Sequence, residues 1–450
     1  TMPDFDIDFE PERTEEVIQY VTQKYGYDKV CRIVTFGRLK AKAVIKDVAR
    51  VFRMPFAEVN EITKLIDTKG MFDHETLKYM FGLADANKKL DDAELQAKYD
   101  DDVKRKNPEL VELYNNNPNV KRVVDIAIKL ENMPRNLSVH AAGVVICNKI
   151  LNENIPLTRV GDTIVTQYNM IDVEELGFLK MDFLRLETLS DIKGALKIIK
   201  DVHNKDIDFY NMEYTDPNVY NLVCSSETDA VFQLEGGGFK KFLQDLQPRQ
   251  LEDIIAGTAL FRPGPMDSIP TYIKNKNDPE HIDYGMECLK PILEPTYGVI
   301  VYQEQVMNIL QVMAGYSLGQ ADLVRRMMSK KHMDEMIAER KTFLNGRDDP
   351  KHPIEGSLKR GATEEFANKI YDQMISFAAY AFNKAHAAAY TFVTYQTAYL
   401  KTYYPVEYII GVLNNRLNKP EDIAKYILYA KRNNYNVYPP DVNKSKTLFS

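Results

Sequence analysis

Acidic and large apolar side chains alternate near the start of the chain. Asp4, Asp6 and Asp8 are separated by Phe5 and Ile7. In a β-strand, a period of two places the carboxylates on one face and the apolar side chains, buried, on the other. Like charges along one strand face repel, so a bound cation is expected there, and hard oxygen ligands suit Mg²⁺ or Mn²⁺. An exposed acidic edge strand that only discourages aggregation is the alternative.

A third carboxylate stands in a similar setting farther along the chain. The apolar run 177–184 contains Lys180 and Asp182, which are two residues apart and therefore share one strand face. We expect Asp6, Asp8 and Asp182 to converge on two metal ions, the standard clamp for phosphoryl displacement, while Lys180 neutralises phosphate. A buried salt bridge from Lys180 to Asp182 or Asp6 is the alternative.

Chain length, charge and cysteine content limit the class of protein. The 450 residues allow two to four domains, and 65 acidic against 58 basic residues give a net charge of −7, so any nucleic-acid binding must be local. The four cysteines are far apart and form neither a disulfide framework nor a zinc motif, which suits a reducing cytoplasm. No apolar stretch approaches the roughly 20 residues of a membrane span. Because the chain opens directly in an expected core strand, we interpret it as a fragment.

One segment is strongly basic in spite of the acidic total. Residues 29–53 include eight basic residues and a single acidic one, Asp47. Such an imbalance can follow a phosphate backbone, and a solvated helix face is the equally weighted alternative. The cations that we expect to contact DNA are Arg38, Lys40, Lys42, Lys46 and Arg50.

Periodicity predicts an α/β layer interrupted by helices and followed by a mainly helical segment after residue 189. A helix is expected over 11–25, a strand over 30–34, a turn over 35–37, and a second helix to about residue 52. The last of these should direct Ala43, Val44, Val48 and Val51 inward. The polar segment 59–132 is interpreted as a helical insertion, and strands are expected at 143–146 and 163–168.

Two helical motifs carry groups that can bind a nucleotide. The run 323–331 is rich in cations, and the paired Arg325 and Arg326 suit a bidentate grip on a triphosphate. In the run 382–390, His386 and Tyr390 lie on successive helical turns among small residues, which allows a planar base pair to approach closely. Surface decoration and core packing are the respective alternatives.

An ordered series of motifs resembles the DnaE-type, C-family replicative polymerases, the alpha subunits of bacterial DNA polymerase III. The likeness covers nearly the whole chain. The series consists of PDFDIDF (3–9), TFG (35–37) leading to AKAVI (41–45), SVHAAG (138–143), KMDFL (180–184), VFQLE (231–235), LFRPGP (260–265), YQEQ (302–305) and FNK (382–384).

The resemblance implies an α+β fold with a palm like that of the polymerase-beta nucleotidyltransferases. It implies that the palm is formed by 1–58 and 133–190, a helical thumb by 59–132 and mainly α-helical fingers by 191–450. It also implies that Asp6, Asp8 and Asp182 are the metal-binding triad. Lys180, Arg325 and Arg326 then fall where the family contacts the incoming triphosphate, with His386 and Tyr390 beside the nascent base pair.

The implied activity is template-directed DNA synthesis with two Mg²⁺ ions, for which Mn²⁺ can substitute. The implied partners are primer-template DNA and dNTPs. A sliding clamp, a clamp loader and a proofreading subunit are expected for the full-length protein, mostly through regions outside this chain. A two-metal nuclease remains a rival, because the same carboxylate clamp cuts phosphodiesters with water. A non-catalytic DNA-binding fragment is the other, because the family's first part of the palm and its amino-terminal domain are not in this sequence.

Overall fold

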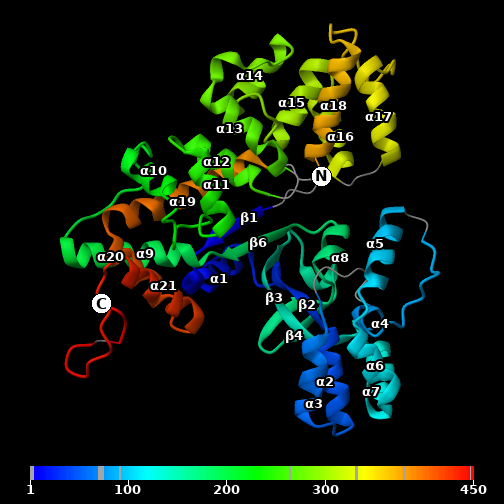
Figure 1. Cartoon of the computed structure of the whole chain (residues 1–450), viewed down its shortest axis with the longest axis vertical. Helices are drawn as coiled ribbons and strands as arrows, with labels where there is room; N and C mark the ends of the chain where they lie inside the picture. Colours follow the sequence, from blue (N-terminus) through cyan, green and yellow to red (C-terminus); the bar gives the residue numbers. More distant parts are fainter. Residues whose placement is uncertain are drawn as a thin grey trace. The chain divides into compact units, whose positions relative to one another are not determined.

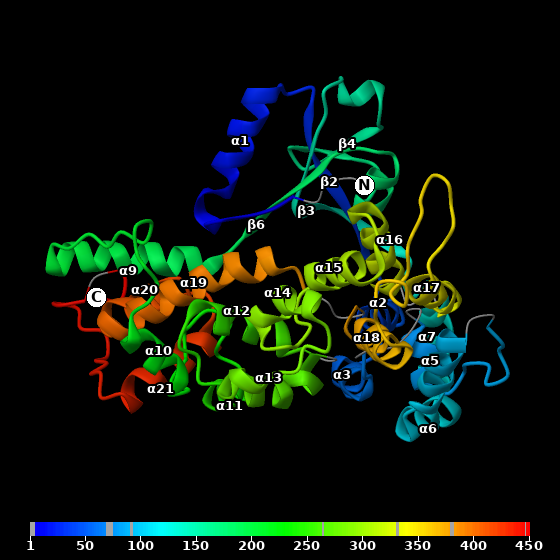
Figure 2. The same ribbon diagram turned by 90° about the horizontal axis from the view of Figure 1, so that it is seen from above.

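The computed structural model describes residues 5–68, 75–90, 93–262, 265–329, 333–378, 382–445 and 447–450. The chain forms two compact units, unit 1 at Thr1–Arg185 and unit 2 at Leu186–Ser450. Unit 1 contains the sheet, whereas every longer element described in unit 2 is a helix (Figures 1 and 2). The expected mixed α and β composition is therefore confirmed, and the assignment of palm, thumb and fingers stays a prediction.

Unit 1 is built on one mixed sheet of six strands in the order β1-β6-β3-β2-β5-β4. β1 and β6 are parallel, and β3 runs antiparallel to both β6 and β2. The strands are β1 (Phe5–Phe9), β2 (Val30–Arg38), β3 (Pro134–Ile146), β4 (Leu157–Val160), β5 (Thr163–Thr166) and β6 (Lys180–Arg185).

The two faces of this sheet have different covers. Helix α1 (Thr14–Tyr25) packs Ile18 and Val21 against Phe183 on one face. On the other face, Val173 of helix α8 (Met170–Glu175) packs against a small core that includes Val145. Because side chains alternate along a strand, Lys180 and Asp182 of β6 point to the face of Val145, and Phe183 points to α1.

A helical layer adjoins the sheet between β2 and β3. Its helices are α2 (Ala41–Val51), α3 (Phe56–Leu65), α4 (Thr76–Met80), α5 (Ala93–Lys104), α6 (Pro108–Asn116) and α7 (Pro118–Leu130). Helices α2, α3, α6 and α7 lie side by side around Val44, Leu110 and Val124 (Figure 1). Asn107 and Asn117 cap α6 and α7, each followed by a proline whose missing N–H costs nothing at the first helical position.

Three local predictions are wrong. Residues 35–37 are not a turn, because β2 continues through Thr35 and Gly37 in register with β3 before α2 begins. Val51 is 75% exposed, because it is the last residue of α2 and lies beyond the packed stripe. Phe5 and Ile7 are also exposed, because β1 is an edge strand that pairs only with β6 among the described strands, and α1 packs near Phe9.

Unit 2 packs its helices around three apolar clusters. One joins α15 to α18, a second joins α10 to α13 with α19, and a third joins α9, α20 and α21. The helices are α9 (Glu187–His203), α10 (Pro217–Cys224), α11 (Gly237–Leu246), α12 (Leu251–Leu260), α13 (Ile269–Asn277), α14 (Lys290–Leu293), α15 (Gln303–Ala314), α16 (Leu318–Ser329), α17 (Met333–Asn345), α18 (Glu364–Ala378), α19 (Lys384–Tyr403), α20 (Pro405–Asn414) and α21 (Pro420–Arg432). Within the described residues, no helix combines the length and the apolar character needed to cross a bilayer.

Candidate active site

The register of β1 and β6 brings the predicted carboxylates to one face of the sheet. The Cα partner of Asp6 is Asp182, and that of Asp8 is Leu184. Paired residues of parallel strands direct their side chains to the same face, and neighbouring strands lie roughly 4.8 Å apart. Asp6, Asp8 and Asp182 therefore share one face, although 176 residues separate Asp6 from Asp182 in the sequence.

Asp182 is the buried member of this group and is 8% exposed. Its Oδ2 lies 2.9 Å from Nζ of Lys180, which is also 3.1 Å from Oε1 of Glu174 on α8. The salt bridge considered from the sequence is thus present. Burial lowers the pKa of Lys180, but hydrogen bonds to Asp182 and Glu174 outweigh it, so the pKa is raised overall.

The second oxygen of Asp182 is the unusual feature of the site. Among the residues that the structure describes, Oδ1 of Asp182 is buried and has no hydrogen-bond partner. Buried polar atoms are nearly always paired, and a buried carboxylate with an unsatisfied oxygen destabilises the fold. Such a cost is commonly found at functional sites, where the missing partner is a substrate or an ion.

The carboxylate face fits a hard divalent cation by its chemistry. Within the described ranges, no three His, Cys, Asp or Glu side chains form a group that could hold a metal ion as they stand. The donors nevertheless suit Mg²⁺, since three carboxylates share one face and Oδ1 of Asp182 is buried without a partner in the described chain.

A bulge in β3 borders Asp182. Gly143 is the Cα partner of Asp182, and a Cβ there would lie 2.9 Å from both Cδ1 of Ile33 and Nδ1 of His140, so a side chain would force these neighbours to move. Nδ1 of His140 accepts a hydrogen bond from the Gly143 N–H at 2.7 Å. The absence of a side chain at Gly143 thus allows close packing beside the carboxylates.

The paired arginines of α16 lie in unit 2. Arg325 and Arg326 both bind Asp322 on the same helix, at 2.8 and 2.6 Å. Burial alone raises the pKa of Asp322, but the two guanidinium groups lower it overall. Arg325 Nη1 also donates to Oε1 of Gln303 at 2.9 Å. The structure thus holds Arg325 next to the first residue of α15, and the motif continues at 330–331 outside the described residues.

The predicted base-pair residues begin helix α19 in the same unit. Asn383 caps the helix by accepting from the His386 N–H at 3.1 Å. The His386 and Tyr390 rings lie 4.3 Å apart, and Phe382 meets His386 edge-on at 5.2 Å. Gln303 N–H donates to the Phe382 carbonyl at 3.1 Å. Through Gln303, the structure connects Arg325 to the start of α19.

Two residues to which the sequence analysis gave no role belong to this group. The guanidinium of Arg262 lies 3.7 Å from the Phe382 ring centroid, and the Phe232 ring stacks on Tyr390 at 5.5 Å and 21°. Both residues occur in motifs that carry the family resemblance, which is the signal that could have identified them. Their partners lie more than a hundred residues away, so spacing alone could not.

The predicted DNA-binding cations lie on the solvent side of unit 1. Lys42, Lys46 and Arg50 follow one another at every fourth residue of α2 and are exposed, opposite its buried stripe. Arg50 pairs with Asp47 at 3.2 Å. Lys40 directly precedes the helix, and Arg38 at the end of β2 donates to the Asn132 carbonyl at 2.8 Å.

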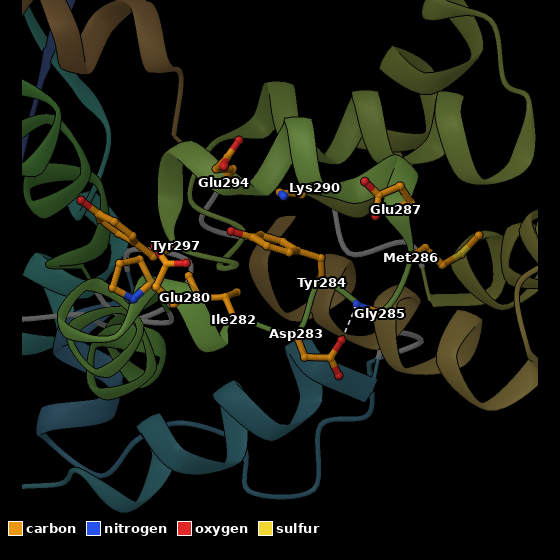
Figure 3. A pocket seen from close by; sticks show the side chains of 11 residues that line it. Glu280, Ile282, Asp283, Tyr284, Gly285, Met286, Glu287, Lys290, Glu294 and Tyr297 are labelled. Atoms are coloured by element: carbon orange, nitrogen blue, oxygen red, sulfur yellow. Dashed lines mark hydrogen bonds between the residues drawn. The ribbon is translucent and has the colours of Figure 1, made fainter.

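A pocket lies elsewhere in unit 2. It has a volume of about 560 Å³ and follows α13, with Tyr284, Tyr297 and several carboxylates around it (Figure 3). A loop turn closes one side, where Asp283 accepts from the Gly285 N–H at 2.8 Å. None of the predicted site residues lines it.

Two family models match the chain, one over unit 1 and the other over the first part of unit 2. Residues 1–185 match the bacterial DNA polymerase III alpha NTPase domain, and residues 188–350 match the bacterial DNA polymerase III alpha subunit finger domain. The boundary between them coincides with the division between the two compact units.

Curated relatives extend the likeness to the whole chain. The DNA polymerase III subunit alpha of Thermus aquaticus is 42% identical over 99% of this chain and 34% of its own length. Those of Aquifex aeolicus and Bacillus subtilis are 39% and 40% identical over all of this chain, and over 38% and 37% of their own lengths. The chain thus spans a little over a third of each relative. It belongs to the family of the bacterial DNA polymerase III alpha subunit.

Proposed function

We propose that this chain carries the catalytic carboxylates of a DNA-directed DNA polymerase, a nucleotidyltransferase that adds dNTPs to a primer 3′-hydroxyl. The observation that carries the proposal is the pairing of Asp6 with Asp182 across two parallel strands, in a member of this family. The reaction joins the 3′-oxygen to the α-phosphorus of a dNTP and releases pyrophosphate.

The carboxylates have one role in this proposal. Asp6, Asp8 and Asp182 would hold two divalent cations, which supply Lewis-acid stabilisation of the charge on the reacting phosphate when they are bound. The buried position of Asp182 excludes water from one side of the site, and this strengthens electrostatic interactions there.

The cations of the chain neutralise the substrate. Lys180 lies beside Asp182 and can turn its ammonium to a phosphate oxygen, because Glu174 and Asp182 already hold it at the carboxylate face. Arg325 and Arg326 offer planar guanidinium groups for the triphosphate, and exchange their contact with Asp322 for it. His386 and Tyr390 present a ring surface against which a base pair stacks.

Duplex DNA would be held by contacts to its phosphates. Lys42, Lys46 and Arg50 form a row on α2, with Arg38 and Lys40 at its start. No residue of this row needs to read a base, because the template strand itself selects the incoming nucleotide by pairing.

Two rivals remain to be separated from this proposal. A two-metal nuclease would use the same carboxylates with water as the nucleophile. A non-catalytic DNA-binding segment would hold the duplex without chemistry. Membership of the polymerase family favours synthesis over both.

The test is primer extension by the natural protein that contains this sequence, with Asp6→Asn and Asp182→Asn as variants. Removing one carboxylate of a metal clamp removes several kcal/mol of transition-state stabilisation, so each variant should reduce activity by about a thousandfold. Asp162→Asn, a change at a fully exposed carboxylate of unit 1, is the control and should keep full activity.

The same gel distinguishes the outcomes. Lengthening of a labelled primer only when dNTPs are present supports the proposal, whereas shortening without dNTPs indicates the nuclease. Extension at a wild-type rate by Asp6→Asn or Asp182→Asn would remove the carboxylate assignment.

A further inference from the structure

The segment between α10 and α11 is held in an unusual backbone conformation. Ser226, Ala230 and Gln233 have φ angles of 63°, 63° and 62°. Residues other than glycine adopt this left-handed region rarely, and they do so where the surroundings over-determine the backbone, often at functional sites. We call residues 226–235 the bracket loop.

Helices α19 and α20 hold the bracket loop through buried side chains. The ammonium of Lys401, which is 5% exposed, donates to the carbonyls of Glu227 and Asp229. Tyr408 Oη donates to the Ala230 carbonyl at 2.6 Å. Thr397 Oγ1 accepts from the Phe232 N–H at 3.1 Å. Several peptide groups of the loop are thus fixed by α19 and α20.

The end of the loop is closed by Glu235. Its carboxylate accepts from the Ala230 N–H across the loop, from Tyr426 Oη at 2.8 Å, and from Nζ of Lys425 at 2.7 Å. Tyr426 and Lys425 belong to α21. Three helices therefore hold a loop of ten residues.

Apolar packing and polar contacts both hold the bracket loop. One side of the loop lines a cavity of about 320 Å³, to which Phe232, Gln233 and Glu235 contribute. A loop beside open space can move unless hydrogen bonds fix it. Val231 and Leu234 anchor the loop in the apolar core, and the polar contacts of Lys401, Tyr408 and Glu235 fix its backbone as well.

The loop presents Phe232 to the predicted nucleotide residues. The Phe232 ring stacks on Tyr390 at 5.5 Å and 21°, and Tyr390 in turn lies 4.3 Å from His386. Phe382 and Arg262 extend this row by an edge contact and a cation–π contact. Phe232 thus bounds one end of a continuous row of rings.

We propose that Phe232 is a positioning residue for nucleotide binding, which it serves by fixing the ring of Tyr390 from the rigid bracket loop. The inference rests on the proposed function. A ring that is already held loses less freedom when a base stacks against its neighbour, so the pocket binds a nucleotide more tightly. The effect should appear in the affinity for dNTP and not in that for DNA.

The test measures single-nucleotide extension by the natural protein that contains this sequence, with Phe232→Leu and Phe232→Tyr as variants. In Phe232→Leu, the KM for dNTP should rise about fivefold, which is the usual worth of an aromatic pair, while kcat and primer-template affinity stay within about twofold. Phe232→Tyr keeps a stacking ring and should restore the KM.

A matched control is a second phenylalanine that packs against a tyrosine of α19. Phe209 is also half-buried and meets Tyr399 of α19 edge-on at 5.9 Å, away from the row. Phe209→Leu should leave the KM for dNTP unchanged. If Phe232→Leu does not fold, Thr397→Val decides. It removes the hydrogen bond from the Phe232 N–H, together with the bond that Thr397 donates to the Thr394 carbonyl within α19, and should raise the same KM.

The outcomes separate this inference from the proposed function. Extension by the wild type with an unchanged dNTP KM in Phe232→Leu, or in Thr397→Val where that variant decides, overturns the positioning role alone. An equal rise in Phe209→Leu also overturns it. Failure of the wild type to extend any primer overturns the proposed function and this inference with it.

Discussion

Two buried charged residues show how single side chains are constrained in this chain. Asp182 keeps an ion pair on one oxygen and no protein partner on the other, within the described residues. Lys401 has the opposite sign and lies among backbone carbonyls, over the Tyr429 ring at 4.3 Å. Burying each charge costs free energy. Asp182 lies at the proposed metal site, and Lys401 holds the bracket loop, to which we also assign a function.

Lys401 should make stability depend on pH. Burial lowers its pKa to about 8, against the partly compensating charge of Asp229 and with the added repulsion of Lys240. Because the folded pKa lies below the unfolded value of about 10.4, the unfolded state binds more protons between these pH values. The free energy of unfolding should therefore rise with pH from about 8 to 10.4 and stay level below 8.

Urea unfolding of the wild type and of Lys401→Met at pH 7.5, 9 and 10 measures this. The difference in unfolding free energy between them should shift by about 3 kcal/mol in favour of the wild type across the range. Lys197→Met, at an exposed lysine of α9, should show no such shift. Parallel pH curves for the wild type and Lys401→Met would show that Lys401 is not buried as a charged group.

Some of these constrained residues could be predicted from the sequence, and others could not. The period of two around Asp6 and Asp8 placed them on one face without any knowledge of the fold. The burial of Lys401 left no such trace, because it follows Tyr399 and Leu400 on a helix whose turns also contain many polar residues. Its partners come from the loop at 227–229, and no local pattern predicts a contact over that separation.

Helix α2 shows what an element adds to its residues. Its buried stripe, with Val44, Ile45 and Val48, fixes which way the helix faces, and the cations at 42, 46 and 50 then follow on the solvent side. The sequence predicted this helix and most of its inward residues. It placed the end of the helix within a residue but was wrong to direct Val51 inward, since periodicity does not say where packing partners stop.

The row on α2 should govern the salt dependence of DNA binding. Removing one cation that binds a phosphate reduces the slope of log affinity against log salt by about 0.9, so the triple change Lys42→Gln, Lys46→Gln and Arg50→Gln should reduce it by about 2.7. Fluorescence anisotropy with a primer-template at several salt concentrations gives the slope.

An equal change of net charge elsewhere controls for the overall field. The exposed lysines Lys197, Lys200 and Lys205 at α9 and just beyond it are replaced together by glutamine. The slope of log affinity against log salt for this control variant should match that of the wild type. Equal slopes for the two triple variants would refute a specific role for α2.

Pairing between strands was beyond the reach of local patterns. Residues 35–37 contain a glycine and looked like a turn, but β3 pairs with them from a hundred residues away and draws them into β2. The strand at 143–146 was expected in place, yet β3 begins at Pro134 and contains the bulge at His140 to Gly143. Tertiary pairing overrides local propensity in both cases.

At the scale of the whole molecule, the chain divides its proposed work between two units. Unit 1 contains the sheet with the carboxylates, and unit 2 contains the arginines and the aromatic row. The sequence predicted a change to helical structure after residue 189, close to the division after Arg185. The family resemblance supplied the reason to treat both units as one enzyme, which composition alone, at a net charge of −7, did not suggest.

The central claim is that Asp6, Asp8 and Asp182 act together on divalent cations. The most direct measurement is a Mn²⁺ titration followed by electron paramagnetic resonance, because only free Mn²⁺ gives the sharp signal and no turnover is needed. We expect the natural protein that contains this sequence to bind Mn²⁺, and Asp6→Asn, Asp8→Asn and Asp182→Asn each to weaken binding about tenfold or more. Asp162→Asn should not. Undiminished Mn²⁺ affinity in Asp182→Asn would contradict the claim.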